Sequence, residues 1–474
     1  MAGRLEPTIA AIATSPGPGG IGIVRISGPG ALGIINQLFV AKRPTPIPIS
    51  HHMAFGWIRR PGSDQILDEV MTVFMAAPNS YTREDVVEIQ CHGNFLILHE
   101  ILLLAQEAGA RLAEPGEFTK RAFLNGRLDL TQAEAVLELL QARTTEGLRL
   151  AINQLHGALH DHLQLIVNAL IRIKAIIEVA IDFPDEEVEI LNPHQILNTF
   201  EKKIIPQLEN LISAADNGKI FRDGIAVVII GRPNVGKSSL LNMLLQEDRA
   251  IVTAEAGTTR DTIEEQITIK GVPVRIIDTA GIRDSQDMIE EIGIQRSRQK
   301  IAQADVVLLV VDASLPVHQD DLDLLESIGT KQLIVVANKR DLCLKPCTTP
   351  VATELNQEGD ALQARFKNYP LVSISAKYGT GLHELEEALF SLVTGQAMGW
   401  DPGYSTVPNA RHRGAMAKAC SACRDLCSGL NVQLSPDLLA IDLQTVLDHL
   451  GEIVGYTTNE EMLDRIFGEF CIGK

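Results

Sequence analysis

An apolar stretch runs directly into a loop framed by glycines, and this arrangement narrows the possible folds of residues 225–245 to a few. Residues 225–230 read Ile-Ala-Val-Val-Ile-Ile, residues 231–238 read Gly-Arg-Pro-Asn-Val-Gly-Lys-Ser, and apolar residues with helical spacing follow. In a strand–loop–helix setting, such glycines let backbone N–H groups wrap phosphates at a helix N-terminus. Lys237 then supplies positive charge to the phosphates, and the Ser238 hydroxyl can ligate Mg²⁺. The sequence therefore predicts an α/β domain that binds a phosphate chain.

Further apolar segments indicate the extent of this α/β domain. They span residues 225–230, 265–270, 274–278, 305–312, 332–338 and 371–374. Helical segments lie between most of them, which predicts a mainly parallel sheet with helices on both faces. We assign this domain to residues 221–392.

The sequence on either side of this domain has a different periodicity. Apolar residues recur with the helical period of 3.6 from about residue 131 to 217, and again from 409 onward. Breaks in the second tract are expected at Gly429, Pro436 and Gly451. Each tract alone would bury too little apolar surface, so we predict one helical domain, residues 121–220 and 393–474, into which the α/β domain is inserted.

Residues 1–120 mix short apolar runs with Gly and Pro. Strands are expected around residues 9–13, 20–26, 70–75 and 85–90, and helices at 29–39 and 94–108, so an α+β domain comes first.

Length and composition limit the number of domains and the kinds of partner that the chain can have. At the usual ~150 residues per domain, 474 residues allow for about three domains. The net charge of -18 argues against wrapping of a nucleic-acid duplex by bulk charge, although a local basic patch could still meet RNA. The N-terminus lacks the apolar core of a secretory signal, and the apolar runs stop short of the ~20 residues that a membrane span needs. We expect a soluble, cytoplasmic protein with reduced cysteines.

Three later motifs indicate which base the site binds and which residues contact the γ-phosphate. Asp278-Thr-Ala-Gly281 sits at a strand end, where the carboxylate can hold Mg²⁺ through water and the glycine N–H can meet the γ-phosphate. In Asn338-Lys-Arg-Asp341, Asp341 can accept hydrogen bonds from N1 and the 2-amino group of guanine, donors that adenine lacks. Ser375-Ala-Lys377 adds a loop over the base. This order predicts a site for GTP and GDP.

The segment between the phosphate loop and the second strand should supply a Thr to Mg²⁺, and Thr259 in Gly257-Thr-Thr-Arg-Asp261 is the candidate. Residue 282 is Ile where Ras-type enzymes have the Gln that orients the attacking water. Another group must take that role, and residues 284–291 offer carboxylates. A solvated acidic loop explains that segment equally well.

Cysteines carry weaker signals. Cys420, Cys423 and Cys427 share one face of a helix, which favours core packing over a metal site. Cys471 is either a buried thiol or a catalytic one. His92 is either a general acid or a turn residue, and we favour the turn.

Motifs outside the nucleotide site carry a more specific resemblance. Residues 115–125 read Pro-Gly-Glu-Phe-Thr-Lys-Arg-Ala-Phe-Leu-Asn, residues 181–187 read Ile-Asp-Phe-Pro-Asp-Glu-Glu, and residues 470–474 read Phe-Cys-Ile-Gly-Lys. With the loops at 231–239 and 257–261, they make essentially the whole chain resemble the tRNA modification GTPases of the MnmE (TrmE) family. The resemblance implies GTP hydrolysis coupled to addition of an aminomethyl or carboxymethylaminomethyl group at C5 of the tRNA wobble uridine. It also implies an FAD-dependent partner of the MnmG/GidA type, in a heterotetramer.

By the same resemblance, the first domain is similar to the tetrahydrofolate-binding domain of one-carbon transfer enzymes and holds a homodimer together. The one-carbon source would be 5-formyl- or methylene-tetrahydrofolate. The implied folate contacts are Arg25, Glu88, Arg127 and Lys474. Other members often have Lys at position 127, and Arg keeps the charge with a different hydrogen-bond geometry.

The resemblance also implies activation by K⁺, which would neutralise transition-state charge where two GTPase domains meet. The implied K⁺ ligands are Asn234, Thr253, Glu255 and Thr258, and the implied water-orienting carboxylate is Glu290. Lys237 and Thr259 complete the predicted catalytic set, and Ser238 and Thr259 the Mg²⁺ ligands. The predicted GTP-binding residues are Asn234, Val235, Gly236, Lys237, Ser238, Ser239, Thr253, Ala254, Glu255, Ala256, Gly257, Thr258, Thr259, Asp278, Thr279, Ala280, Gly281, Asn338, Lys339, Asp341, Ser375, Ala376 and Lys377.

A ribosome-assembly or regulatory GTPase of the Era or Der type is the main alternative, because its phosphate loop is much the same. That class would append an RNA-binding module or a second GTPase domain, and this sequence has a folate-like domain and a helical return instead. A structural dimer with a vestigial site would require a damaged motif, and every nucleotide motif here is intact.

Overall fold

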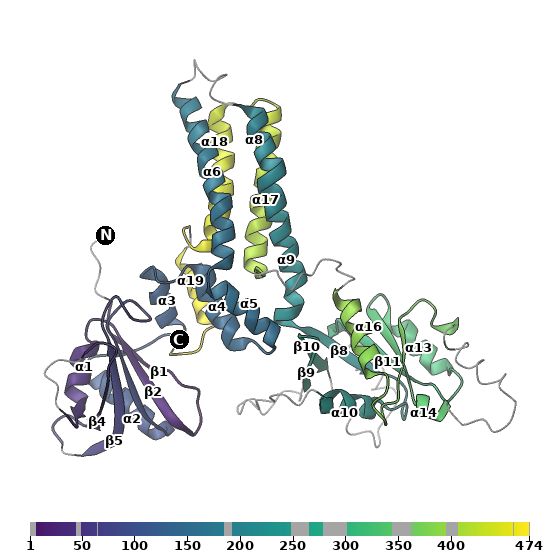
Figure 1. Ribbon diagram of the computed structural model, residues 1–474, viewed down its shortest axis with the longest axis horizontal. Coiled ribbons are helices and arrows are strands. Elements are labelled where there is room, and N and C mark those ends of the chain that lie inside the picture. The colour runs from purple at the N-terminus through teal and green to yellow at the C-terminus, as the bar shows by residue number, and fades with distance from the viewer. Residues whose placement is uncertain are drawn as a thin grey trace. The chain divides into compact units, whose positions relative to one another are not determined.

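The computed structural model describes residues 6–43, 49–63, 65–183, 192–247, 265–277, 301–343, 362, 364–394, 406–457 and 459–473. The chain forms two compact units (Figure 1). One consists of Met1–Leu140, Ile152–Glu209 and Arg411–Lys474, and the other of Gln141–Ala151 and Asn210–Ala410. Because the first unit resumes after the second, the α/β domain is an insertion, as the helical tracts predicted.

A seven-stranded sheet forms the N-terminal part of the first unit. Its order is β3-β4-β5-β6-β2-β1-β7. The strands are β1 (Ile9–Ile12), β2 (Gly19–Ser27), β3 (Phe39–Ala41), β4 (Met53–Arg59), β5 (Ile66–Met75), β6 (Val86–Gly93) and β7 (Arg111–Leu112). All neighbours are antiparallel except β1 and β7. Helices α1 (Ala31–Leu38) and α2 (Phe95–Glu107) bury their apolar residues in one core with the sheet, and both were predicted.

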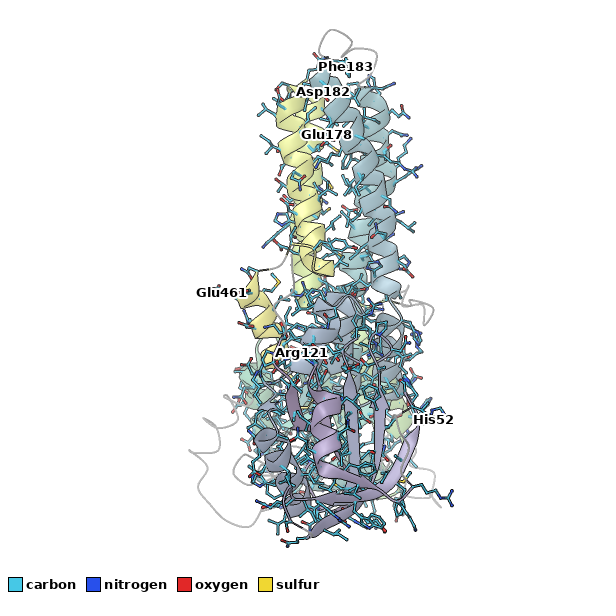
Figure 2. All side chains as sticks on the ribbon, turned by 90° about the vertical axis from the view of Figure 1, so that its left-hand side faces the viewer. His52, Arg121, Glu178, Asp182, Phe183 and Glu461 are labelled. Atoms are coloured by element: carbon cyan, nitrogen blue, oxygen red, sulfur yellow. The ribbon has the colours of Figure 1, made fainter. Side chains whose placement is uncertain are left out.

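Arg121 is the largest fully buried side chain that the structure describes (Figure 2). It lies on α3 (Glu117–Leu124), within the Phe-Thr-Lys-Arg signature. Its guanidinium contacts Glu117 Oε1 at 2.8 Å and Glu84 Oε2 at 3.1 Å, and it donates to the Pro7 carbonyl at 2.9 Å. A buried charge needs such partners, so the signature serves to fasten α3 to the sheet domain. Just before α3, Pro115 pairs with Ile472 in an isolated antiparallel bridge.

Long helices make up the rest of the first unit. They are α4 (Leu130–Gln141), α5 (Thr145–Leu155), α6 (Ala158–Asp182), α8 (Pro193–Thr199), α9 (Ile205–Asp223), α17 (Ala410–Asn431), α18 (Pro436–Val454) and α19 (Glu460–Gly468), with a short π-helical turn at Phe200–Ile204; α5 and α9 extend into the second unit. Helices α6 and α18 lie side by side (Figure 1), and Lys174 Nζ of α6 donates to Gln444 Oε1 of α18 at 2.8 Å. A helix from before the insertion therefore packs on one from after it.

Two of the three expected helix breaks are wrong. Pro436 does begin α18, but Gly429 lies inside α17 and Gly451 inside α18. A Cβ at Gly429 would lie 2.9 Å from Leu434 Cδ1, and one at Gly451 would lie 2.9 Å from Thr457 Oγ1. These glycines allow close packing within continuous helices, so they do not end them.

The second unit contains a six-stranded sheet of order β13-β12-β11-β8-β10-β9. The strands are β8 (Ile225–Ile230), β9 (Glu265–Ile269), β10 (Val272–Ile277), β11 (Val306–Asp312), β12 (Gln332–Asn338) and β13 (Leu371–Ser373). All pairs are parallel except β9 with β10. The predicted mainly parallel sheet is confirmed.

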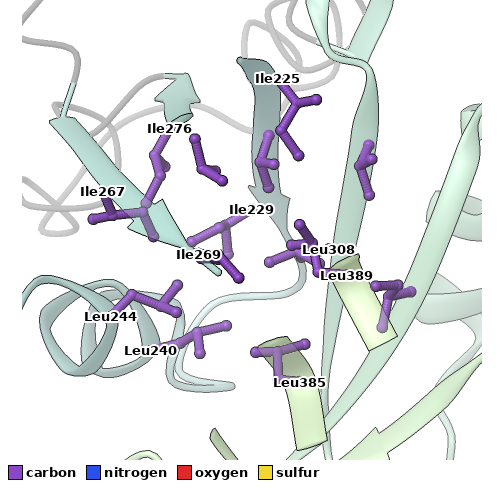
Figure 3. Packing of buried hydrophobic residues seen from close by; sticks show 14 of the residues in the cluster. Ile225, Ile229, Leu240, Leu244, Ile267, Ile269, Ile276, Leu308, Leu385 and Leu389 are labelled. Carbon is purple, nitrogen blue, oxygen red and sulfur yellow. The ribbon is translucent and has the colours of Figure 1, made fainter. Parts of the chain in front are cut away.

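Helices cover both faces of this sheet. They are α10 (Lys237–Glu247), α13 (Gln319–Ile328), α14 (Arg340–Cys343) and α16 (Leu382–Thr394). Every residue of β8 and β11 is buried, as a strand covered on both faces requires. Figure 3 shows one face, where Ile229 of β8 lies among Leu240 of α10 and Leu385 of α16. None of the helices in the described ranges is long and apolar enough to cross a membrane.

Candidate nucleotide-binding site

The phosphate loop connects β8 to α10 and has a backbone that glycine makes possible. Gly231 and Gly236 have φ of 153° and 100°, and Asn234 between them has φ of 61°. A Cβ at Gly231 would lie 2.3 Å from the Val310 carbonyl oxygen, and one at Gly236 would lie 2.2 Å from Asn338 Nδ2. Both glycines are therefore required by close approach of a neighbouring strand as well as by the left-handed backbone.

Lys237 is the first residue of α10, and its side chain curls back over the loop. Its Nζ donates to the carbonyl oxygens of Gly231 and Arg232, each at 2.8 Å. Burial lowers the pKa of Lys237. The two hydrogen bonds hold the Lys237 Nζ at the loop, beside the helix N-terminus and the loop N–H groups that attract phosphate. Ser238 follows at the same helix N-terminus, as a phosphate-loop ligand of Mg²⁺ must.

The guanine-recognition motif is tied directly to the phosphate loop. Asn338, at the end of β12, donates from Nδ2 to the Val235 carbonyl at 2.9 Å and accepts at Oδ1 from the Ala376 N–H at 3.0 Å. Ser375 Oγ donates to Asp341 Oδ1 at 2.6 Å. Three motifs that the sequence predicted separately therefore lie together, and Ser375 fixes the carboxylate that is predicted to recognise guanine.

Two acidic residues of this site were missed by the sequence reasoning. Asp312, the last residue of β11, accepts from Lys339 Nζ at 2.6 Å, and Asp321 of α13 accepts from Arg232 Nε at 2.8 Å. Residues 305–312 were assigned only as a strand. An acidic residue at the carboxyl end of a parallel strand, where α/β sheets bind ligands, was the signal that could have found Asp312.

Part of the predicted nucleotide and folate sets lies outside the described residues. These residues are Thr253, Ala254, Glu255, Ala256, Gly257, Thr258, Thr259, Asp278, Thr279, Ala280, Gly281, Glu290 and Lys474.

A second cluster of charged and aromatic side chains lies in the N-terminal domain. Arg25 of β2 and Glu88 of β6 are register partners, and Arg25 Nε contacts Glu88 Oε1 at 2.8 Å. The Arg25 guanidinium lies 5.7 Å from the centroid of the Tyr81 ring, and that of Arg127 lies 4.6 Å from the same centroid. Three of the four residues predicted to contact folate are therefore together around Tyr81, which the sequence reasoning did not single out.

The C-terminal residues reach the same cluster. Arg25 Nη1 donates to the Gly473 carbonyl at 3.3 Å. Cys471, two residues before Gly473, is exposed. The terminal signature therefore contacts Arg25, which the family resemblance implies as a folate contact.

His92 is not a turn residue. It lies in β6, and its Nδ1 is 2.8 Å from Asp68 Oδ1. By contrast, Cys420, Cys423 and Cys427 are buried in α17, as predicted. Burial raises the pKa of the Cys423 thiol to about 12 and that of Cys427 to about 11. Neutral thiols are poor metal ligands, and no group of metal-binding side chains is present in the described ranges.

A mainly parallel sheet, with a phosphate loop hydrogen-bonded to the Asn-Lys-Arg-Asp motif, is typical of the class of P-loop GTPases. Two family models cover most of the chain: one described as "MnmE helical domain" matches residues 130–471, and one described as "GTP-binding protein TrmE N-terminus" matches residues 8–127. The chain belongs to the MnmE family of tRNA modification GTPases, and the predicted resemblance is confirmed.

Full-length relatives agree with this assignment. The tRNA modification GTPase MnmE of Desulfotalea psychrophila is 48% identical over 471 residues, 98% of each chain. That of Natranaerobius thermophilus is 45% identical over 470 residues, 99% of this chain and 100% of the relative. A solved structure of an Era variant from Aquifex aeolicus with GDP and AlF4⁻ is 26% identical over 42% of this chain and 66% of that chain; its TM-score of 0.27 supports no conclusion. Membership makes the chain a GTP hydrolase that uses Mg²⁺, and the full-length match favours it over the Era or Der alternative.

Proposed function

We propose that this chain uses GTP hydrolysis to install an aminomethyl or carboxymethylaminomethyl group at C5 of the wobble uridine in tRNA. The observation that carries the proposal is the full-length match to proteins named tRNA modification GTPase. A bonded network between the phosphate loop and the guanine motif supports the GTPase half of it. The chain would act as a homodimer with an FAD-dependent protein of the MnmG/GidA type.

Mass spectrometry of wobble nucleosides tests this proposal. Cells that lack the chain are expected to accumulate wobble uridine without the C5 group, and the wild-type gene should restore the modification. Unchanged nucleosides in the deletion strain would reject the proposal. Size-exclusion chromatography with light scattering of the chain mixed with the flavoprotein tests the partnership. Elution of the two proteins as separate peaks at micromolar concentration would count against it.

The catalytic part of the proposal assigns Mg²⁺ to Ser238 and Thr259. It assigns K⁺ to Asn234, Thr253, Glu255 and Thr258, and orientation of the attacking water to Glu290. Ile282 has no polar atom with which to orient water, so another group is needed. Asn234 supports the K⁺ assignment, because it carries an amide oxygen within the phosphate loop itself.

Replacement of Na⁺ by K⁺ is expected to raise the rate of GTP hydrolysis at least tenfold. A bound cation would stabilise transition-state charge as an arginine finger does, a role worth about 10³-fold or more in related chemistry. Phosphate release at saturating GTP and constant ionic strength measures the effect, with Glu290→Ala as a second arm that should lose turnover and keep GTP affinity. Equal rates in the two salts contradict the K⁺ site, and normal turnover of Glu290→Ala contradicts the role of Glu290.

For the N-terminal domain we propose a tetrahydrofolate site at Arg25, Glu88, Arg127 and Lys474. When bound, the folate would supply the one-carbon unit. A carboxylate such as Glu88 suits the donor edge of a pterin, and cationic side chains suit the glutamate tail. The clustering of Arg25, Glu88 and Arg127 around Tyr81 supports this assignment. Cys471 is kept as a candidate for chemistry because it is exposed.

Arg25→Met is expected to weaken binding of 5-formyl-tetrahydrofolate by about tenfold or more, since a hydrogen bond to a charged group is worth roughly 1.5–3 kcal/mol. Titration calorimetry measures the effect. Arg60→Met is the matched control, because Arg60 forms an exposed ion pair with Glu100 in the same domain. Equal affinity of wild type and Arg25→Met would show that folate binds elsewhere.

A further inference from the structure

Two carboxylates within residues 312–321 belong to none of the nucleotide motifs, yet each contacts a basic residue of the predicted GTP site. Asp312 ends β11 and is 7% exposed, and Asp321 lies in the first turn of α13 and is 1% exposed. Burial of a carboxylate costs free energy unless charged or hydrogen-bonding partners compensate. The partners of these two residues therefore indicate what they are for.

Asp312 holds the lysine at the centre of the guanine motif. Its Oδ2 accepts from Lys339 Nζ at 2.6 Å, while its Oδ1 accepts from the Ser314 N–H at 3.0 Å and from Ser314 Oγ at 2.6 Å. Lys339 has φ of 66°, a backbone state that residues with a Cβ rarely adopt. Burial raises the pKa of Asp312, but the bonds from Lys339 and Ser314 outweigh it and the net pKa is lowered, so the carboxylate is charged at neutral pH. The ammonium end of the Lys339 side chain is thus held by Asp312.

Asp321 holds the phosphate loop in a similar way. Its Oδ1 accepts from Arg232 Nε at 2.8 Å, and its Oδ2 accepts from the His318 N–H at 3.2 Å, as part of a capping box that fixes the start of α13. Arg232 is the second residue of the phosphate loop, and its carbonyl oxygen accepts from Lys237 Nζ. Asp321 therefore anchors the loop that positions the phosphate-binding lysine.

We propose that residues 312–321 form a positioning element of the GTP site, in which Asp312 orients Lys339 at the guanine motif and Asp321 orients Arg232 in the phosphate loop. This one short segment, which starts at the end of β11, thus contacts both the predicted base-binding motif and the phosphate loop. Each carboxylate acts on the nucleotide through its basic partner. The proposal concerns GTP binding and is independent of the tRNA, K⁺ and folate assignments.

Asp312→Asn and Asp321→Asn test the two contacts. Asparagine keeps the shape and one acceptor oxygen of aspartate but removes the charge that holds the basic partner. Each variant is expected to raise the Kd for GDP and GTP by about tenfold, the typical worth of a charge-assisted hydrogen bond. The effect should appear in Kd and KM, with a much smaller change in kcat. Asp323→Asn, on the exposed side of α13, is the matched control and should leave all three unchanged.

A double-mutant cycle separates positioning from general stabilisation. On a Lys339→Met background, Asp312→Asn should add less than about a twofold change in Kd, and on an Arg232→Met background the same should hold for Asp321→Asn. A full tenfold effect on those backgrounds, or unchanged Kd values in the single variants, overturns the proposal. Thermal melting identifies any variant that fails to fold. Ser314→Ala then serves in place of Asp312→Asn, with an expected rise in Kd of about threefold, and unchanged affinity there also overturns it.

Discussion

Asp341→Asn is expected to lower the affinity for GTP by about 10²- to 10⁴-fold. In the proposed geometry the Asp341 carboxylate accepts from N1–H and the 2-amino group of guanine, and each such bond to a charged group contributes roughly 1.5–3 kcal/mol. Ser375 Oγ holds the carboxylate from 2.6 Å, so the side chain is already aimed before nucleotide arrives. Asparagine removes the charge and turns an amide donor toward the 2-amino donor. Competition against a fluorescent GDP analogue measures the loss.

The same substitution should improve recognition of a different base. Xanthine carries an oxygen where guanine carries the 2-amino group, so the asparagine amide can donate to it. We therefore expect Asp341→Asn to prefer XTP to GTP, and Asp323→Asn to keep the wild-type preference. A variant that loses GTP and XTP equally would show that Asp341 supports the loop without reading the base.

Gly236→Ala is expected to reduce nucleotide affinity by more than about 100-fold. Most of this loss should come from the displacement of Asn338 by the new Cβ. The new Cβ would lie 2.2 Å from Asn338 Nδ2, at a backbone φ of 100°. Asn338 would have to release the Val235 carbonyl, which it now bonds at 2.9 Å, and the loop N–H groups would lose the alignment that binds phosphate. Such backbone strain alone costs about 1–3 kcal/mol. Equilibrium binding of GTP, with thermal melting in parallel, checks the result.

Gly329→Ala is the matched control for Gly236→Ala. Gly329 also has a positive φ, 66°, but a Cβ there would meet nothing within 4 Å. It carries the backbone strain without the clash, so it should lower stability and leave GTP affinity close to wild type. If Gly236→Ala binds GTP no worse than Gly329→Ala, the close approach to Asn338 does not matter for the site.

The central strands of the GTPase sheet were predictable because each appears in the sequence as a run of apolar residues. Strands β8 and β11 are buried on both faces, and a fully buried strand appears in sequence as an unbroken apolar run. The N-terminal sheet was harder. Strand β4 carries Gly56 at its centre, which reads as a break, but a Cβ there would lie 2.2 Å from the Val40 carbonyl of β3. The glycine permits the two strands to pair, and only the structure shows the neighbour that requires it.

In the nucleotide site, too, some residues could be predicted from the sequence and others could not. The residues assigned to phosphate and base were predictable because nucleotide chemistry demands certain residue types at fixed spacing. The pairing of Asp312 with Lys339 and of Asp321 with Arg232 joins residues 27 and 89 positions apart, and nothing in either local sequence specifies the partner. Tyr81 was missed for a similar reason, since an aromatic ring gains its role from the two guanidinium groups that the fold brings to it.

The contact between Arg25 and Gly473 links residues 448 positions apart. A ribosome synthesises chains from the N-terminus, so β2 and its arginine must wait while the helices and the entire inserted GTPase unit are made. The contact at Arg25 can form only after Gly473, in the terminal signature, has been synthesised. An expressed fragment that ends before Gly473 would therefore lack the carbonyl that Arg25 contacts at that corner. Assembly of this corner therefore follows synthesis of the inserted GTPase unit.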